Sequence, residues 1–123
     1  MIFTDEYYMA LALKEATYAL EEDEVPVGAI MVCNNKIIGK GYNQTERLKD
    51  VTAHAEMLAI TAAANYLGTK FLEECTLYVT LEPCQMCAGA LYWSQISKIV
   101  FGARDEQRGF MKMDTLLHPK TIV

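Results

Sequence analysis

Residues 76–90 read Thr-Leu-Tyr-Val-Thr-Leu-Glu-Pro-Cys-Gln-Met-Cys-Ala-Gly-Ala. The first six, Thr76 to Leu81, are rich in β-branched and aromatic residues, which is typical of a strand. Pro83 suits the first turn of a helix running from Cys84 to about Ser94, because the N–H that proline lacks would have no partner there. Strands that pass directly into helices are typical of layered α/β proteins. We therefore expect a sheet covered by helices.

The same reasoning predicts further strands at residues 27–33, 36–42 and 96–102. Asn34 and Asn35 suit a tight turn between the first two, because Asn tolerates positive φ. A short helical segment around residues 113–117 and a last strand at 118–123 complete the prediction. The result is a sheet of about five strands in a single domain.

Two more helices are indicated by capping residues. Thr4 is a candidate N-cap for the first, whose expected apolar face is Met9, Leu13, Ala16 and Leu20. This helix should end in the acidic run 21–24, because negative charge opposes the dipole at a helix C-terminus and Pro26 prevents continuation. The second helix is expected to begin after Thr52 and to stop at Gly68, with residues 43–50 forming a polar loop.

Composition places few limits on the substrate. The chain of 123 residues is 52% apolar and has a net charge of −5, as soluble globular proteins often do. Seven of its 16 acidic residues lie in residues 1–24 with a single lysine, which leaves nine acidic and ten basic residues beyond them. A locally bound nucleic acid is therefore allowed, whereas wrapping of a long duplex is not expected. The sequence shows neither an export signal nor a membrane span, so we expect a cytoplasmic protein.

The residues with the clearest chemistry are His54, Glu56, Cys84 and Cys87. One His and two Cys make three metal ligands, the number found in catalytic zinc sites that keep a fourth position for water. All three are expected at helix starts, where partial positive charge favours thiolate over thiol. Glu56, two residues after His54, is placed to move a proton without binding the metal. Zinc lowers the pKa of a bound water from 15.7 to about 7.

The same residue types also occur in other kinds of site. A Cys-x-x-Cys pair also occurs in redox proteins and in four-ligand structural zinc sites. The remaining candidates for a fourth ligand are poor: Cys33 and Cys75 belong to expected strands, where a free Cys usually packs in the core, and His118 is close to a proline near the C-terminus. We therefore predict a catalytic zinc site with one Zn²⁺ per chain.

His-x-Glu followed by Pro-Cys-x-x-Cys is the signature of zinc-dependent nucleobase deaminases. The chain resembles bacterial tRNA-specific adenosine deaminases, within the cytidine and deoxycytidylate deaminase superfamily, over nearly its whole length. The matching blocks are residues 24–29, 41–43, 52–56, 76–90 and 100–105. The resemblance implies a three-layer deaminase fold with a central mixed sheet flanked by helices. Relatives carry a further C-terminal helix beyond the position of Val123, so the expected domain is residues 1–123 without that helix.

The resemblance also implies hydrolysis of the wobble adenosine of a tRNA anticodon to inosine, with zinc held by the three ligands and protons moved by Glu56. Asn43 would then hydrogen-bond the target nucleotide, with Val25 and the Ala55 backbone forming the base pocket. Arg104 and Asp105 lie where relatives meet RNA, although a solvated charged loop is an equal alternative. Asn43 could likewise be only a turn residue. Relatives are typically homodimers, and the tRNA anticodon stem-loop is the expected partner.

Three alternatives to this function remain. A deaminase of a free base or nucleoside, of the guanine or cytosine type, would use the same zinc chemistry. A noncatalytic RNA-binding or assembly subunit of the same fold would need the three ligands but not Glu56. A structural zinc module lacks a convincing fourth ligand.

Overall fold

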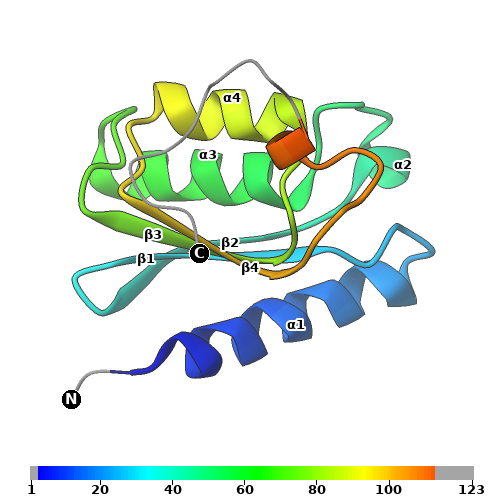
Figure 1. The fold of residues 1–123 in the computed structure, drawn as a ribbon, viewed down its shortest axis with the longest axis horizontal. Helices are drawn as coiled ribbons and strands as arrows, with labels where there is room; N and C mark the ends of the chain where they lie inside the picture. Colours follow the sequence, from blue (N-terminus) through cyan, green and yellow to red (C-terminus); the bar gives the residue numbers. More distant parts are fainter. Residues whose placement is uncertain (1–2, 113–123) are drawn as a thin grey trace.

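The computed structural model describes residues 3–112 and shows a sheet between two helical layers (Figure 1). The described strands are β1 (Gly28–Cys33), β2 (Lys36–Tyr42), β3 (Cys75–Leu81) and β4 (Lys98–Ala103). They lie in the order β2-β1-β3-β4, with β1 antiparallel to both of its neighbours and β4 parallel to β3. The sheet is therefore mixed, as expected. The strand predicted at 118–123 and the helical segment at 113–117 lie outside the described residues.

Helix α1 (Asp5–Glu21) covers one face of the sheet, while α3 (Ala55–Leu67) and α4 (Gln85–Trp93) cover the other (Figure 1). Residues on β1 alternate between the two layers: Ala29 and Met31 pack toward α3, and Ile30 and Val32 toward α1. Such alternation follows from the two-residue period of a strand. Both faces of β1 are buried, which explains why its sequence has no polar positions alternating with apolar ones.

The start of α1 is as predicted, but its apolar face is so only in part: Ala16 is buried and Met9 packs against the core, as expected. Thr4 is the N-cap, with its hydroxyl accepting a hydrogen bond from the Tyr7 N–H at 3.1 Å. The buried face consists of Tyr8, Ala12, Ala16 and Ala19. Leu13 and Leu20 are more than half exposed. The reason is a close approach to β1, because a Cβ on Gly28 would overlap the Ala12 carbonyl oxygen. Only small side chains fit at this contact.

The tight turn and the second predicted helix also differ in part from expectation. Asn34 and Asn35 both adopt positive φ between β1 and β2, which confirms the turn. Helix α3 begins two residues later than a Thr52 cap would place it, with His54 as its N-cap. The Thr52 side chain instead donates a hydrogen bond to Asp50 at 2.7 Å, within a turn. Residues 43–50, predicted as a loop, contain the one-turn helix α2 (Thr45–Leu48).

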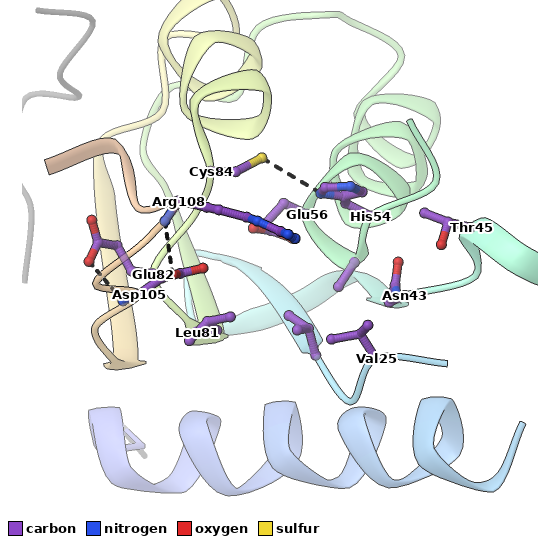
Figure 2. Close-up of a pocket in the computed structure, with 12 residues that line it drawn as sticks. Val25, Asn43, Thr45, His54, Glu56, Leu81, Glu82, Cys84, Asp105 and Arg108 are labelled. Atoms are coloured by element: carbon purple, nitrogen blue, oxygen red, sulfur yellow. Dashed lines mark hydrogen bonds between the residues drawn. The ribbon is translucent and has the colours of Figure 1, made fainter. Parts of the chain in front are cut away.

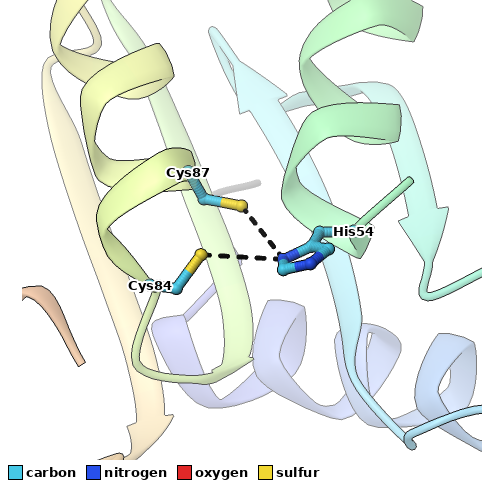
Figure 3. A group of neighbouring side chains, drawn as sticks. All are labelled: His54, Cys84 and Cys87. Carbon is cyan, nitrogen blue, oxygen red and sulfur yellow. Dashed lines mark hydrogen bonds between the residues drawn. The ribbon is translucent and has the colours of Figure 1, made fainter. Parts of the chain in front are cut away.

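The helix ends place the chemistry-bearing residues together. His54 and Cys84 are the N-caps of α3 and α4, so the two helix starts lie side by side at one end of the sheet (Figure 3). Gly41 allows α3 to approach β2 closely, since a Cβ there would overlap the Ala55 carbonyl oxygen. No helix within residues 3–112 is long and apolar enough to cross a membrane.

Candidate active site

His54, Cys84 and Cys87 form a compact cluster of metal-type ligands. The Nδ1 atom of His54 lies 3.7 Å from the sulfur of Cys84 and 3.5 Å from that of Cys87 (Figure 3). All three ligand atoms lie within 4.8 Å of one another. The predicted ligand set is therefore brought together by the fold. Among the described residues, Cys33 and Cys75 lie outside this cluster, and His118 is not described.

The spacing of these atoms fits zinc. Bond lengths of about 2.05 Å to nitrogen and 2.3 Å to sulfur, at a tetrahedral angle, put the two ligand atoms about 3.6 Å apart. The two N–S distances in the cluster, 3.7 and 3.5 Å, bracket that value. Three protein ligands leave the fourth tetrahedral position for water or substrate.

The ionisation of the two thiols also favours a bound cation. A hydrogen bond from the Cys87 side chain, together with the backbone N–H groups of Cys87 and Met86, lowers the pKa of Cys84 to about 5. The same hydrogen bond and burial raise the pKa of Cys87. The hydrogen bond between the two thiols thus favours ionisation of Cys84 over that of Cys87. A dication between them would stabilise both as thiolates, because metal ligation deprotonates thiols.

Glu56 lies in the first turn of α3, two residues after His54, and is 4% exposed. Burial raises the pKa of its carboxyl group to about 7. A carboxyl group with this pKa can both accept and release a proton near neutral pH. Its side chain lines the same pocket as His54 and Cys84 (Figure 2). Glu56 therefore has the position and acidity expected of a proton carrier.

The pocket beside the ligands has a volume of about 270 Å³. It is lined by residues from both sides of the cluster and from the sheet edge beneath it: Val25, Val27, Asn43, Thr45, His54, Ala55, Glu56, Leu81, Glu82, Cys84, Asp105 and Arg108. The predicted residues Asn43, Val25 and Ala55 are thus all on the pocket (Figure 2). The fold therefore brings the residues predicted to contact the substrate into the same pocket as His54 and Cys84.

One wall of the pocket is supported by a buried carboxylate. Glu24, 5% exposed, accepts hydrogen bonds from the N–H groups of Glu46 at 3.1 Å and Arg47 at 2.8 Å. These are N–H groups in the first turn of α2, which lack partners within the helix. The contact anchors the segment that carries Asn43 and Thr45. Asn43 is 7% exposed and its N–H donates to the Val27 carbonyl at 3.1 Å.

The opposite wall is the segment that follows β4. Asp105 lines the pocket, but Arg104 is not among the lining residues, and its guanidinium lies 3.6 Å from the Glu82 carboxylate. Arg108 also lines the pocket, with its side chain extending toward Glu56 (Figure 2).

No role in the site was predicted for Thr45 or Glu82, and Arg108 was expected only as part of the loop 104–108, where relatives meet RNA. Only Glu82 gave a signal in the sequence, as a single carboxylate where an apolar strand meets a helix.

Comparison with known proteins agrees with this geometry. The family model described as the cytidine and deoxycytidylate deaminase zinc-binding region matches residues 3–103. The chain belongs to this deaminase family. Its ligand cluster lies within the matched zinc-binding region, so the family's metal and the donor set agree.

Several individual proteins are similar to this chain. It is 57% identical to a tRNA-specific adenosine deaminase of Aquifex aeolicus (strain VF5), over 85% of this chain and 69% of that protein. It is 53% identical to one of Bacillus subtilis (strain 168), over 85% and 65%. The chain thus spans about two thirds of the length of these relatives.

A solved structure from a study of A-to-I editing by tRNA:A34 deaminases superimposes with a TM-score of 0.89 at 41% identity, covering 96% of this chain and 91% of that one. Another solved structure, of a guanine deaminase from Bacillus subtilis, superimposes with a TM-score of 0.80 at 35% identity over 83% of this chain and 66% of that chain. The fold is therefore shared by proteins named for different purines.

Proposed function

We propose that this protein hydrolyses the wobble adenosine of a tRNA anticodon to inosine, with release of ammonia. The observation that carries the proposal is Glu56, buried with a raised pKa in a pocket beside three zinc-type ligands. The names of the relatives at 57% and 53% identity support the substrate. The reaction adds one water, replaces the amino group at C6 of the purine by oxygen, and releases ammonia.

His54, Cys84 and Cys87 would hold the zinc. When bound, zinc supplies the Lewis acidity that makes water a nucleophile at neutral pH. Glu56 then has two tasks: it takes the two protons of the attacking water one after the other, and it passes one to the ring nitrogen and the other to the departing amino group. A pKa near 7 suits both, because the same carboxyl group must act as base and then as acid.

The pocket residues would hold the adenosine. The side-chain amide of Asn43 can both donate and accept hydrogen bonds. Val25 forms an apolar part of the pocket wall, and the backbone of Ala55 forms a polar part. Asp105 lines the other side and would meet the ribose or a neighbouring nucleotide. Arg104, more than half exposed, would meet the RNA outside the pocket. The base must leave its stack to enter, as in other nucleobase deaminases.

The protein is further proposed to act as a homodimer in the cytoplasm. Support for an interface comes from α4, where Met86, Tyr92 and Trp93 are exposed, Trp93 to 74%. Exposed large apolar side chains gathered on one helix mark association surfaces. Sedimentation should give twice the chain mass, and Trp93→Glu should shift it toward the monomer. A parent protein that sediments as a monomer at micromolar concentration would exclude the dimer.

Mass spectrometry of an anticodon stem-loop tests the substrate. The zinc-loaded protein should convert one adenosine to inosine, a change of about one mass unit. A stem-loop with guanosine at the wobble position is the matched control and should remain unchanged. The same assay with free guanine, adenine and cytosine tests the second candidate function, which the 35% identity to a guanine deaminase favours. If a free base is deaminated while the stem-loop stays unchanged, the protein is a free-base deaminase and the tRNA substrate is excluded.

A further inference from the structure

Glu82 is a buried carboxylate with no task in the proposed chemistry. It lies between β3 and α4, and its side chain is fully buried. One carboxylate oxygen, Oε1, accepts a hydrogen bond from the Asp105 N–H at 3.1 Å and lies 3.6 Å from the Arg104 guanidinium. The other, Oε2, accepts from the Met111 N–H at 2.9 Å. Burying a charge is costly unless it is paired in this way, so the arrangement needs all of these donors.

These contacts join both ends of one segment to a single side chain. Asp105 is near the start of the segment 104–111 and Met111 is at its end. The segment also wraps around the residue that follows Glu82, since the Phe110 N–H donates to the Pro83 carbonyl at 3.0 Å. Gly109 lies so close to Glu82 that a Cβ there would overlap the Oε2 atom. The segment is therefore built around the carboxylate.

The segment carries two side chains of the pocket. Asp105 accepts hydrogen bonds at 3.0 Å from the N–H groups of both Gln107 and Arg108, which closes the turn that presents Arg108. The backbone of Asp105 is in turn held by Glu82. A chain of contacts thus leads from the buried carboxylate through Asp105 to Arg108, whose guanidinium extends over the pocket (Figure 2).

We propose that Glu82 is a positioning residue: its carboxylate holds the segment 104–111 so that Arg108 and Asp105 face the substrate in the pocket. Arg108 is the only lysine or arginine among the pocket-lining residues within 3–112, so its placement governs how the pocket meets a phosphate next to the target nucleoside. This inference rests on the proposed function for its substrate, but not for its effect on the segment. Two N–H donors facing two oxygens require a carboxylate, because an amide offers only one acceptor.

The test compares Glu82→Gln with Gly109→Ala, which disturbs the same contact from the other side. Both should raise KM for the anticodon stem-loop about tenfold and leave kcat within about threefold, because binding is lost while the ligands and Glu56 are untouched. Zinc content should equal that of the parent. Amide hydrogen exchange of residues 104–111 should become faster in both variants. Ser94→Ala is the control, because it removes another buried polar group, at the far end of α4, and should leave KM and this exchange unchanged.

The possible results distinguish the positioning role of Glu82 from the proposed tRNA substrate. If Glu82→Gln keeps the KM and the exchange rates of the parent, Glu82 only fills space and the inference is wrong. A fall in kcat at unchanged KM would also overturn it, since that pattern belongs to a group acting in the transition state. If the parent does not deaminate the stem-loop, the proposed function fails, while hydrogen exchange still decides whether Glu82 holds the segment.

Discussion

At the scale of single residues, the site depends on a carboxyl group and two thiols whose pKa values are shifted by their surroundings. Burial raises the pKa of the Glu56 carboxyl group, and hydrogen bonds at a helix start lower the pKa of the Cys84 thiol. The other two cysteines lie away from this cluster. Cys75, for example, lies opposite Cys33 across β1 and β3 and belongs to the core.

Replacement of Glu56 by Ala should separate metal binding from catalysis. The three zinc ligands remain, so zinc content should match that of the parent, whereas kcat should fall by about a hundredfold to ten-thousandfold because the proton carrier is lost. Metal analysis and deamination rates measure the two effects. Glu73→Ala, at an exposed position, serves as the control. Substantial turnover by Glu56→Ala would assign the proton transfer to another group.

Cys87→Ala and Cys75→Ala form a matched pair, because both remove a fully buried thiol. Cys87→Ala should retain less than about a tenth of the parent's zinc, since the remaining His and Cys bind too weakly. Cys75→Ala should be less stable than the parent but fully zinc-loaded. Metal analysis after dialysis measures the difference. Full zinc in Cys87→Ala would remove Cys87 from the ligand set.

Alkaline pH should destabilise the fold in part through Cys75. Burial, followed by a hydrogen bond with Cys33, raises the pKa of the Cys75 thiol in the folded state. The unfolded chain releases this proton near pH 8.5 while the folded protein still holds it, so the free energy of unfolding falls as pH rises above that value. Thermal melts from pH 7.5 to 10 should show a smaller decline for Cys75→Ala than for the parent. Equal declines would exclude this contribution.

At the scale of elements, close backbone contacts decide how the helices lie on the sheet. Helix α1 uses small residues because it approaches β1 at Gly28, and α3 approaches β2 at Gly41. The starts of α3 and α4 are the parts of these layers that carry the ligands. A pattern of large apolar residues therefore predicts only part of the buried face of α1. Leu13 and Leu20 do not fit a contact where Ala12 and Ala16 lie against Gly28.

Gly28→Ala should lower the free energy of unfolding by about 2 kcal/mol, because the added methyl group forces α1 away from β1. Gly68→Ala is the comparison. Gly68 has a φ of +71° with open space around it, so an alanine there meets only backbone strain of about 1 kcal/mol. Urea unfolding of both variants measures the difference. A loss at Gly28 no larger than that at Gly68 would show that α1 can shift without cost.

At the scale of the whole molecule, the fold joins three distant segments at one end of the sheet. His54 and the cysteine pair are about thirty residues apart in sequence, and the segment 104–111 comes from beyond β4. Each reaches the pocket from a different element (Figure 2). Zinc bound across two of these elements should therefore stabilise the entire domain.

Removal of zinc by a chelator should lower the melting temperature by more than about 10 °C. A ligand present at about a thousandfold excess over its Kd raises the free energy of unfolding by about 4 kcal/mol, and about 1 kcal/mol corresponds to about 4 °C in a domain of this size. Calorimetry with and without chelator measures the shift, and added zinc should reverse it. An unchanged melting temperature after proven zinc loss would show that the helix starts hold together without the metal.

The sequence by itself determined most of the described elements and the chemistry of the site. Local signals such as Thr4 and Asn34 act within a few residues of their own position and are correct, whereas Pro83 lies just before the N-cap of α4 and not in its first turn. The ligands and Glu56 are recognisable because zinc chemistry demands those residue types at that spacing.

The tertiary structure alone decided which face of α1 is buried and what forms the pocket walls. Those outcomes depend on contacts between residues far apart in the chain, such as Ala12 with Gly28, Glu24 with Arg47, and Glu82 with Met111. The spacing of apolar residues along a helix carries no information about the shape of the element it packs against. A glutamate that is buried in the fold cannot be told from an exposed one by sequence, because its hydrogen-bond donors come from distant residues.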